Sequence, residues 1–396
     1  MLSSNSDSSA LNPFLDDLPE DTLSSSSETT IDFLSYSLIS SLNFISIFVN
    51  NRINHNACEY QEPSIIILDY RNTQNDQSLF IAHKIPFIFN GFKFDFLPER
   101  GDFIKVLGSF NDLLLCGAVK TDYSAFYICN RFTKQWISLP LLKNCKGDDH
   151  FGLICEPFYS RSAKQSEYTI NAEYRYRVVC FTEIEKGNVI VRTYVSEICA
   201  WKAFLLYGGD YQFCSNVVAH NGKLHWFNGL NVVAYDPFND EKICYINGSE
   251  IQPNVEMLNS YYLGVSQGVL KMTHLVSTIY FNGDGDDIEN LSIWELKDYE
   301  TGHWNLEHRI YSFNAKSNGF RDGTGICDPV TLAFNPTDKD TVYLKFGQEV
   351  MLCDLQGEKL QLAGEIPKGI GCFDGDKAFP VMLPWWPTPV HVSAHP

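Results

Sequence analysis

The stretch VLGSFNDLLLCGAVKTDYSAFYICNRFTKQWISLP, residues Val106–Pro140, decides the fold. It contains two apolar runs, Leu113–Cys116 and Phe126–Cys129, which are bounded by turn-forming residues such as Asn111-Asp112. Short runs rich in aromatic and β-branched residues between such turns are typical of consecutive antiparallel strands. About four such strands make one blade of a β-propeller, so the stretch predicts one blade.

The same stretch resembles the F-box-associated domain of plant-type F-box proteins. The matching residues are Asn111, Leu113–Gly117, Tyr127, Cys129, Asn130, Thr133–Trp136, Leu139 and Pro140. Two positions differ from the family pattern: Asp112 replaces the usual Gly, and Arg131 replaces a frequent Pro, although both residues fit a turn. The resemblance implies an all-β, kelch-like β-propeller that binds other proteins.

Further units with the same layout follow along the chain. They cover residues 173–206, 217–246, 261–310 and 328–366, and their spacing fits the roughly 40–50-residue period of blade repeats. Two strand-like stretches remain, Ser64–Arg71 and Phe379–Pro387, and we expect them to share one sixth blade, because pairing of the chain ends removes exposed sheet edges. The sequence therefore predicts about six blades.

Two local features accompany these repeats. Each unit ends in a strand with a hydrophobic closing residue, namely Trp136, Ile243, Trp304 and Leu360–Leu362, and we expect Trp136 to be buried at the base of its blade. Asn-Gly pairs start at positions 90, 221, 228, 247, 282 and 318, and each is expected to form a hairpin turn.

The N-terminal region differs in composition. Residues 1–17 are rich in Ser, Asn and Asp and are expected to be disordered. The segment DLPEDTL, with Leu18, Pro19 and Leu23, has a helix N-terminus signal and resembles the start of an F-box. Ser37–Phe48 resembles the end of an F-box, but serines stand where its middle helices belong. We assign 18–50 to a short, helical, degenerate F-box segment and 60–396 to the propeller.

Bulk composition limits the possible partners. The formal net charge of −18 argues against binding to nucleic acid or to anionic membrane surfaces. Phe33–Val49 has no charged residue, but it is shorter than the ~20 apolar residues of a membrane span and contains several serines, so a buried or partly buried helix is favoured over a span. The cysteines, including Cys116, Cys129, Cys180, Cys244 and Cys353, are expected to be reduced core residues of a cytoplasmic or nuclear protein.

Motifs that suggest chemistry have a simpler structural interpretation. Gly264-Val-Ser266-Gln-Gly268 matches the nucleophile elbow of hydrolases, but a strand-like run follows it where a helix is required. Asn282–Asp287 resembles part of a calcium loop, but the glycine required at the sixth position of such a loop, counted from Asp284, is missing. The pairs His220/His225 and His303/His308 have no accompanying zinc-ligand pattern, and Trp385-Trp386 fits a packed closing strand as well as a recognition surface. We therefore predict no catalytic residue, metal site or cofactor.

The family resemblance then implies a function. An F-box protein is the substrate receptor of an SCF-type ubiquitin ligase: its F-box binds a Skp-type adaptor, here through Leu18, Pro19 and Leu23, and its propeller binds the target protein. Such a receptor performs no chemistry itself and positions two reactants. A stand-alone interaction propeller without adaptor binding is the alternative. An enzyme is the weakest hypothesis, because the sequence offers no convergent nucleophile, base and electrophile.

Overall fold

The structure is a computed structural model. It describes residues 42–56, 64–69, 78–82, 90–92, 94–98, 104–119, 123–143, 145, 149–161, 168–184, 187–207, 213, 215–239, 242–248, 251, 259–278, 288–311, 330–346, 348–365, 377–382, 384 and 386–390. The chain divides into two compact units, residues 1–55 with 159–172 and residues 56–158 with 173–396.

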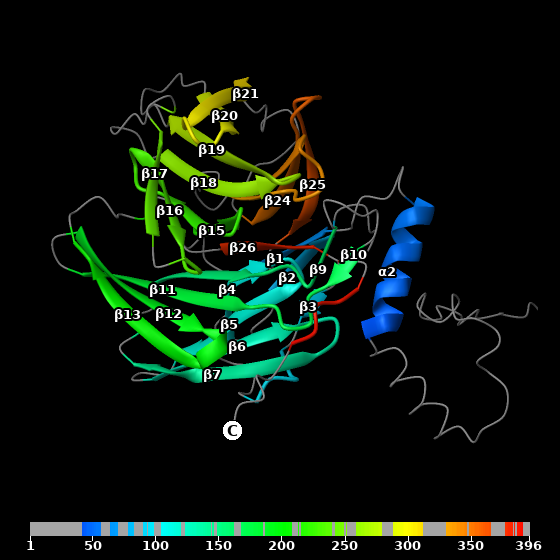
Figure 1. The fold of residues 1–396 in the computed structure, drawn as a ribbon. Helices are drawn as coiled ribbons and strands as arrows, with labels where there is room; N and C mark the ends of the chain where they lie inside the picture. The colour runs from blue at the N-terminus through cyan, green and yellow to red at the C-terminus, as the bar shows by residue number, and fades with distance from the viewer. Residues whose placement is uncertain are drawn as a thin grey trace, which may run out of the picture. The chain divides into compact units, whose positions relative to one another are not determined.

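The second unit consists of antiparallel sheets of four strands (Figure 1). The first three sheets are β4 (Ile104–Phe110), β5 (Leu113–Val119), β6 (Tyr123–Asn130) and β7 (Gln135–Lys143); β8 (His150–Cys155), β11 (Tyr176–Ile184), β12 (Asn188–Val195) and β13 (Ala200–Leu206); and β14 (Val218–His220), β15 (Lys223–Phe227), β16 (Asn231–Asp236) and β17 (Lys242–Asn247). The short 3₁₀ helix η3 (Ser196–Ile198) connects β12 to β13.

The remaining sheets complete the set. The fourth is β18 (Asn259–Ser266), β19 (Val269–Thr278), β20 (Ile288–Asp298) and β21 (His303–Tyr311), and the fifth is β22 (Val330–Phe334), β23 (Thr341–Phe346), β24 (Glu349–Asp354) and β25 (Lys359–Glu365). The sixth combines the two ends of this unit: β26 (Lys377–Met382), β1 (Ser64–Asp69), β2 (Ser78–Ala82) and β3 (Asn90–Phe92).

The innermost strands of these sheets form a ring. β4 contacts β8, β8 contacts β14, and the series continues through β18, β22 and β26 back to β4. Radially arranged four-stranded sheets around a closed ring of inner strands define a β-propeller. The predicted all-β propeller is therefore confirmed.

The opening stretch forms the blade β4–β7, as predicted. Leu113–Cys116 on β5 and Phe126–Cys129 on β6 are buried. Both faces of a middle strand are covered by neighbouring blades, so its apolar run is continuous, and the hydrophobic alternation of a half-exposed strand is lost. β11 shows the same effect, because Tyr176–Thr182 is buried throughout.

The prediction that Trp136 is buried is wrong. Trp136 lies on β7, the outermost strand of its blade, and remains 37% exposed with its ring edge-on against Tyr127. An outermost strand has solvent along one edge, so half of its positions stay open. Trp304 occupies the corresponding strand of the fourth blade but is 2% exposed, because it packs in a buried apolar cluster with residues of the third blade such as Ile246. Its indole Nε1 also donates a hydrogen bond of 3.0 Å to the carbonyl oxygen of Asn247 at the end of β17.

Two of the Asn-Gly pairs form the predicted hairpin turns. Asn221 and Gly222 both have positive φ (46° and 74°) between β14 and β15, and Asn228-Gly229 joins β15 to β16. Left-handed backbone at both central positions is what a type I′ turn requires. Asn90-Gly91 instead lies within β3, so the turn prediction is wrong there, and Asn247 ends β17. The pairs at 282 and 318 lie outside the described residues.

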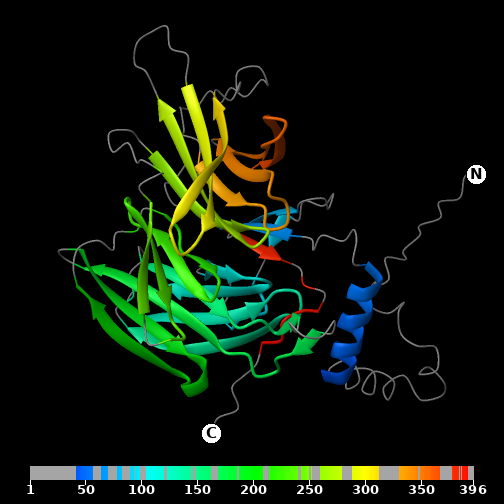
Figure 2. The same cartoon turned by 45° about the horizontal axis from the view of Figure 1, so that its top comes forward.

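The two ends of the propeller join in one sheet, as the sequence predicted. β26 pairs with β1 in antiparallel register from Ser64↔Met382 to Asp69↔Lys377. Figures 1 and 2 show β26, in red, beside β1, in blue. Ile67 and Phe379, which are partners in this register, pack in the same buried cluster as Leu114 of the first blade.

A segment after β26 forms hydrogen bonds with the first blade. We name residues 387–390 the C-terminal latch. The backbone N–H of Thr388 donates to Asp112 Oδ2 at 2.7 Å, and the carbonyl oxygen of Thr388 accepts from Asn130 Nδ2 at 2.9 Å. Asn130 Nδ2 also donates to Asp112 Oδ2 at 2.6 Å. The side chains of Asp112 and Asn130, which belong to the same blade, thus both bind the C-terminal latch. Asp112 occupies the position where the family usually has Gly.

Further contacts extend the latch. Tyr174 donates its hydroxyl hydrogen to the carbonyl oxygen of Pro389 at 2.6 Å, and the N–H of Val390 donates to Gln135 Oε1 at 3.1 Å. Because Tyr174 precedes β11, the latch connects the first and second blades. Burial raises the pKa of Asp112, although its hydrogen bonds with Thr388 and Asn130 act in the opposite direction.

The first unit contains the helix α2 (Leu42–Asn56) and the hairpin β9 (Tyr159–Arg161)–β10 (Tyr168–Ile170). Ile45 and Val49, one helical turn apart, are buried, whereas Ile47 is exposed. The helix thus has one buried stripe, as expected for a partly buried segment. None of the described helices has the length and apolar character needed to cross a membrane.

Candidate functional site

The up-and-down path of the strands gives the propeller two distinct rims. Within each blade the strands are antiparallel, so turns between the first and second and between the third and fourth strands lie on one rim. We name this the turn rim. The opposite rim, which we name the connection rim, carries turns between second and third strands and the segments that lead from one blade to the next.

The two rims differ in connection length. On the turn rim, β4 and β5 are joined by two residues, Asn111-Asp112, and β18 and β19 by Gln267-Gly268; the long connection on this rim is 156–175, which joins β8 to β11 and includes β9 and β10. At the connection rim, the last strand of one blade and the first strand of the next are separated in sequence by between six residues (β7 to β8) and 18 residues (β21 to β22). Binding residues concentrate on long connections held by a rigid scaffold, so the connection rim is the candidate interaction site.

The two most exposed large apolar side chains among the described residues support this choice. Tyr207 is 74% exposed and follows β13 in the second blade; Leu230 is 64% exposed and lies between β15 and β16 in the third. Both positions belong to the connection rim, on adjacent blades. On the turn rim, Ile198 in η3 is 55% exposed and Phe132, between β6 and β7, is 43% exposed. An exposed Tyr is typical of side chains that dominate binding energy at protein interfaces.

Ser266 of the GxSxG motif is not placed as a nucleophile. Its side chain is buried, and its Oγ donates a 2.7 Å hydrogen bond to the carbonyl oxygen of Asn335. The following residues, Gln267 and Gly268, have positive φ (48° and 73°) and form the tight turn into β19. The motif therefore makes a strand-to-strand turn that is tied to the neighbouring blade, not the strand-to-helix elbow of a hydrolase.

The histidine pair on the third blade has a structural role. His225 is buried, and its Nε2 lies 2.8 Å from the hydroxyl oxygen of Tyr299. Burial, together with the charges of His220 and Lys223, lowers the pKa of His225 to about 3. A neutral imidazole in this setting bridges two blades by a hydrogen bond. His303 and His308 both lie on β21.

Other residues singled out in the sequence cannot be placed. Leu18, Pro19 and Leu23, the predicted adaptor-binding residues, and the acidic loop Asn282–Asp287 lie outside the described residues. Trp385 also lies outside them, whereas Trp386 is described and half-buried just before the C-terminal latch.

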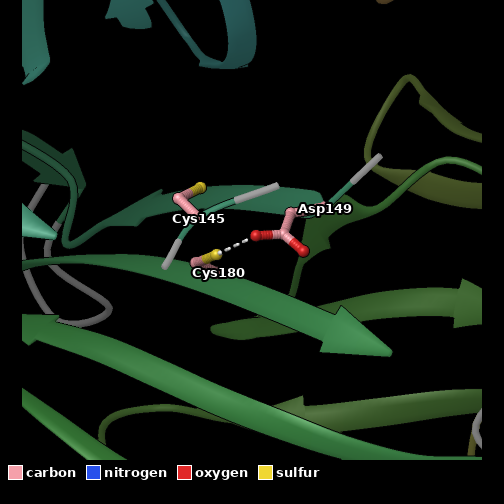
Figure 3. A group of neighbouring side chains, drawn as sticks. All are labelled: Cys145, Asp149 and Cys180. Carbon is pink, nitrogen blue, oxygen red and sulfur yellow. Dashed lines mark hydrogen bonds between the residues drawn. The ribbon is translucent and has the colours of Figure 1, made fainter. Parts of the chain in front are cut away.

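One chemical cluster escaped sequence reasoning. Cys145, Asp149 and Cys180 each offer one ligand atom, and these atoms all lie within 4.8 Å of one another. Figure 3 shows the Cys180 thiol directed at the Asp149 carboxylate, with Cys145 beside them, and Cys180 Sγ donates to Asp149 Oδ2 at 3.5 Å. A hydrogen bond with Cys145 and burial raise the pKa of Cys180. Cys180 is distant in sequence from the other two, so no local motif signals the cluster.

The fold and its two rims define a β-propeller, and comparisons with known proteins identify its family. Residues 96–378 match the family model described as "F-box protein At3g26010-like, beta-propeller". Because this match covers more than half of the chain, the chain belongs to this family of F-box-protein propellers. The resemblance seen in Val106–Pro140 is thereby confirmed.

A curated relative agrees with this assignment. The chain is 25% identical over 230 residues to "F-box protein At5g49610" of Arabidopsis thaliana, a match that covers 54% of this chain and 58% of the relative. The chain thus spans less than two thirds of the length of this relative.

Solved structures resemble the chain only distantly. TolB from Acinetobacter baumannii aligns with a TM-score of 0.42 and 11% identity, covering 84% of this chain and 69% of that chain. A protein from Lactobacillus plantarum aligns with a TM-score of 0.39 and 12% identity, covering 82% of this chain and 100% of that one. Scores this low support no statement about function.

Proposed function

We propose that this protein is the substrate-recognition subunit of an SCF-type ubiquitin ligase, and that its propeller binds a target protein. The observation that carries the proposal is the match of residues 96–378 to a propeller of F-box proteins. In this proposal the composite sheet β26-β1-β2-β3 is the sixth blade of a kelch-like propeller, and the protein acts in the cytoplasm or nucleus without catalysing a reaction.

In this proposal the chain enters the propeller at one rim and the target protein binds at the other. Ser64, the first residue of β1, pairs with Met382 at the end of β26, and the N–H of Met382 donates to the carbonyl oxygen of Asn111 on the turn rim. The chain therefore enters the propeller at the turn rim. The opposite, connection rim, with Tyr207 and Leu230, is left for the target. The adaptor would bind the segment that includes Leu18, Pro19 and Leu23.

A stand-alone interaction propeller is the second candidate, and one observation favours it. Serines at 24–27 replace the apolar residues that the middle of an F-box requires. Serines offer little apolar surface, and a small interface depends on a few buried anchors. We therefore expect the full chain to bind a Skp-type adaptor weakly, because each 1.4 kcal/mol of lost interaction weakens binding about tenfold.

A binding titration separates the two candidates. Full-length protein is titrated with the adaptor, beside the double variant Leu18→Ala, Pro19→Ala and the control Phe132→Ala. Binding that the double variant weakens at least about tenfold, and the control does not, supports the ligase role. No binding by the folded chain leaves the stand-alone propeller, whereas equal binding by all three proteins would show that Leu18 and Pro19 do not carry the adaptor contact.

The target-binding rim is tested separately. Proteins cross-linked to the full chain are compared between Tyr207→Ala, Leu230→Ala and the turn-rim control Phe132→Ala. The proposal predicts that a shared set of proteins is lost in the first two variants and kept in the control. A set lost only with Phe132→Ala would place recognition on the turn rim.

A further inference from the structure

The cluster of Cys145, Asp149 and Cys180 gathers ligands from the junction of two blades. Cys145 follows β7 of the first blade, Asp149 immediately precedes β8, and Cys180 lies in the middle of β11 in the second blade. Cys180 is opposite Phe151 in the β8–β11 register, and this pairing brings its thiol beside the residues that lead into β8. The three side chains thus converge where the chain passes from one blade to the next.

The chemistry of this donor set is that of a soft divalent metal site. Thiolate sulfur and carboxylate oxygen are both ligands of Zn²⁺, and three protein ligands with one further position make up a tetrahedral zinc site. Asp149 and Cys180 are buried, and Cys145 is partly buried. A buried carboxylate beside two thiols differs from the exposed acidic groups that are common on any surface.

The surroundings balance the charge of such a site. Two thiolates and one carboxylate around a divalent ion leave a net charge of about −1. Arg192, opposite Cys180 in the β11–β12 register, donates from Nη1 to Thr182 Oγ1 at 2.6 Å. Thr182 Oγ1 lies 3.9 Å from Cys180 Sγ. The Arg192 guanidinium is therefore connected to the cluster through the Thr182 hydroxyl, in the manner of the groups that surround the direct ligands in metal sites.

We propose that Cys145, Asp149 and Cys180 bind a Zn²⁺-class divalent ion, with a water molecule as the fourth ligand. The ion joins the connection that follows β7 to the middle strand of the second blade. Binding releases the thiol protons, so metal affinity falls as pH decreases. The site fixes one segment of the connection rim and is independent of adaptor binding.

The test is a titration of the full chain with Co²⁺, kept reduced with a phosphine, because tetrahedral Co²⁺ with thiolate ligands gives a sulfur-to-metal charge-transfer band. We expect one bound Co²⁺ per chain, displaced by Zn²⁺. The band should disappear in Cys145→Ser, whose side chain is only partly buried. In Asp149→Asn the affinity should fall at least roughly tenfold, since loss of even an outer-shell partner costs that much.

A second thiol pair provides the control. Cys116 and Cys129 are buried with their sulfur atoms 3.7 Å apart. Cys116→Ser should leave the Co²⁺ band unchanged. A band that persists in Cys145→Ser, or that is lost in Cys116→Ser with the fold intact, overturns the proposal. A Cys145–Cys180 disulfide in protein purified without reductant, detected by mass, together with no Co²⁺ band after reduction, also overturns it and identifies a redox pair.

Discussion

Replacement of Asp112 by alanine tests the C-terminal latch directly. Asp112 Oδ2 accepts hydrogen bonds from the Thr388 N–H and from Asn130 Nδ2, and both donors are shielded from water. Alanine leaves the Thr388 N–H without an acceptor, whereas Asn130 Nδ2 keeps its hydrogen bond to the Thr388 carbonyl oxygen. One buried donor left unpaired costs about 1–3 kcal/mol, and recovery of the desolvation cost of the carboxylate offsets part of this, so we expect a net loss of about 1–2 kcal/mol.

The variant Asp112→Asn separates the hydrogen bonds from the charge. Burial raises the pKa of Asp112 above its ordinary value of 3.8. The protonated Asp112 carboxyl group therefore contributes fully to the stability of the folded state below that pH, and this contribution is lost as the pH rises through the folded-state pKa. At neutral pH the buried charge is therefore a cost that asparagine removes. The amide oxygen can still accept from Thr388, and we expect stability within about 1 kcal/mol of the wild type.

The assay is urea unfolding of the full chain at neutral pH, followed by tryptophan fluorescence. Asp354→Ala is the matched control, because its carboxylate also accepts two backbone hydrogen bonds, from Gln356 and Gly357, but at an exposed turn. We expect the order of stability wild type, Asp112→Asn, Asp354→Ala and then Asp112→Ala. If Asp112→Ala unfolds at the same urea concentration as Asp354→Ala, the latch contributes nothing beyond an ordinary turn.

Three further predictions concern single residues. Trp304→Ala should cost about 3–5 kcal/mol and Trp136→Ala only about 1–2 kcal/mol, since Trp304 is buried and Trp136 is 37% exposed; equal losses in thermal unfolding would contradict this ranking. Burial raises the pKa of Glu197, but hydrogen bonds from Arg177 outweigh it and lower the pKa to about 2. The stability advantage of wild type over Glu197→Gln should thus be complete above about pH 4.5 and shrink toward pH 2; an advantage that grows with acidification in urea titrations would refute this. Ser266 should not react with an organophosphonate probe, and Ser266→Ala should lose about 1 kcal/mol with the hydrogen bond to the Asn335 carbonyl; a covalent adduct at Ser266 by mass spectrometry would show that the hydroxyl is accessible and activated.

Much of the propeller could be predicted because its signals are local. The apolar runs Leu113–Cys116 and Phe126–Cys129 and their bounding turns are contained in one short stretch, and they form β5 and β6. Pairing of Ser64–Asp69 with the C-terminal strand followed from a general rule, that a sheet edge without a partner is a liability. Such a rule predicts that the first and last strands of the propeller pair, but it does not predict which residues are opposite one another.

The features that were missed depend on neighbours from distant parts of the sequence. Trp136 and Trp304 occupy equivalent positions in their repeats, but only Trp304 meets a carbonyl group, that of Asn247, from the preceding blade. The cluster of Cys145, Asp149 and Cys180 forms only once β8 and β11 pair. Asn90-Gly91 satisfies a turn rule, but its backbone belongs to strand β3. In each case a tertiary contact decides an outcome that the local pattern leaves open.

Closure of the ring by both chain ends is the central structural claim, and hydrogen exchange of the third blade tests it most directly. In the ring of inner strands, β14 is separated from β26 by β4 and β8 on one side and by β18 and β22 on the other. The full chain is compared with a variant that lacks residues 379–396 and with one that lacks only 384–396. If the ring is one cooperative unit, removal of 379–396 abolishes the slow exchange of amides in β15 and β16, and removal of 384–396 weakens it in part. Unchanged protection of β15 and β16 after removal of 379–396 would show that the blades are stable without the closing strand, and would contradict the account.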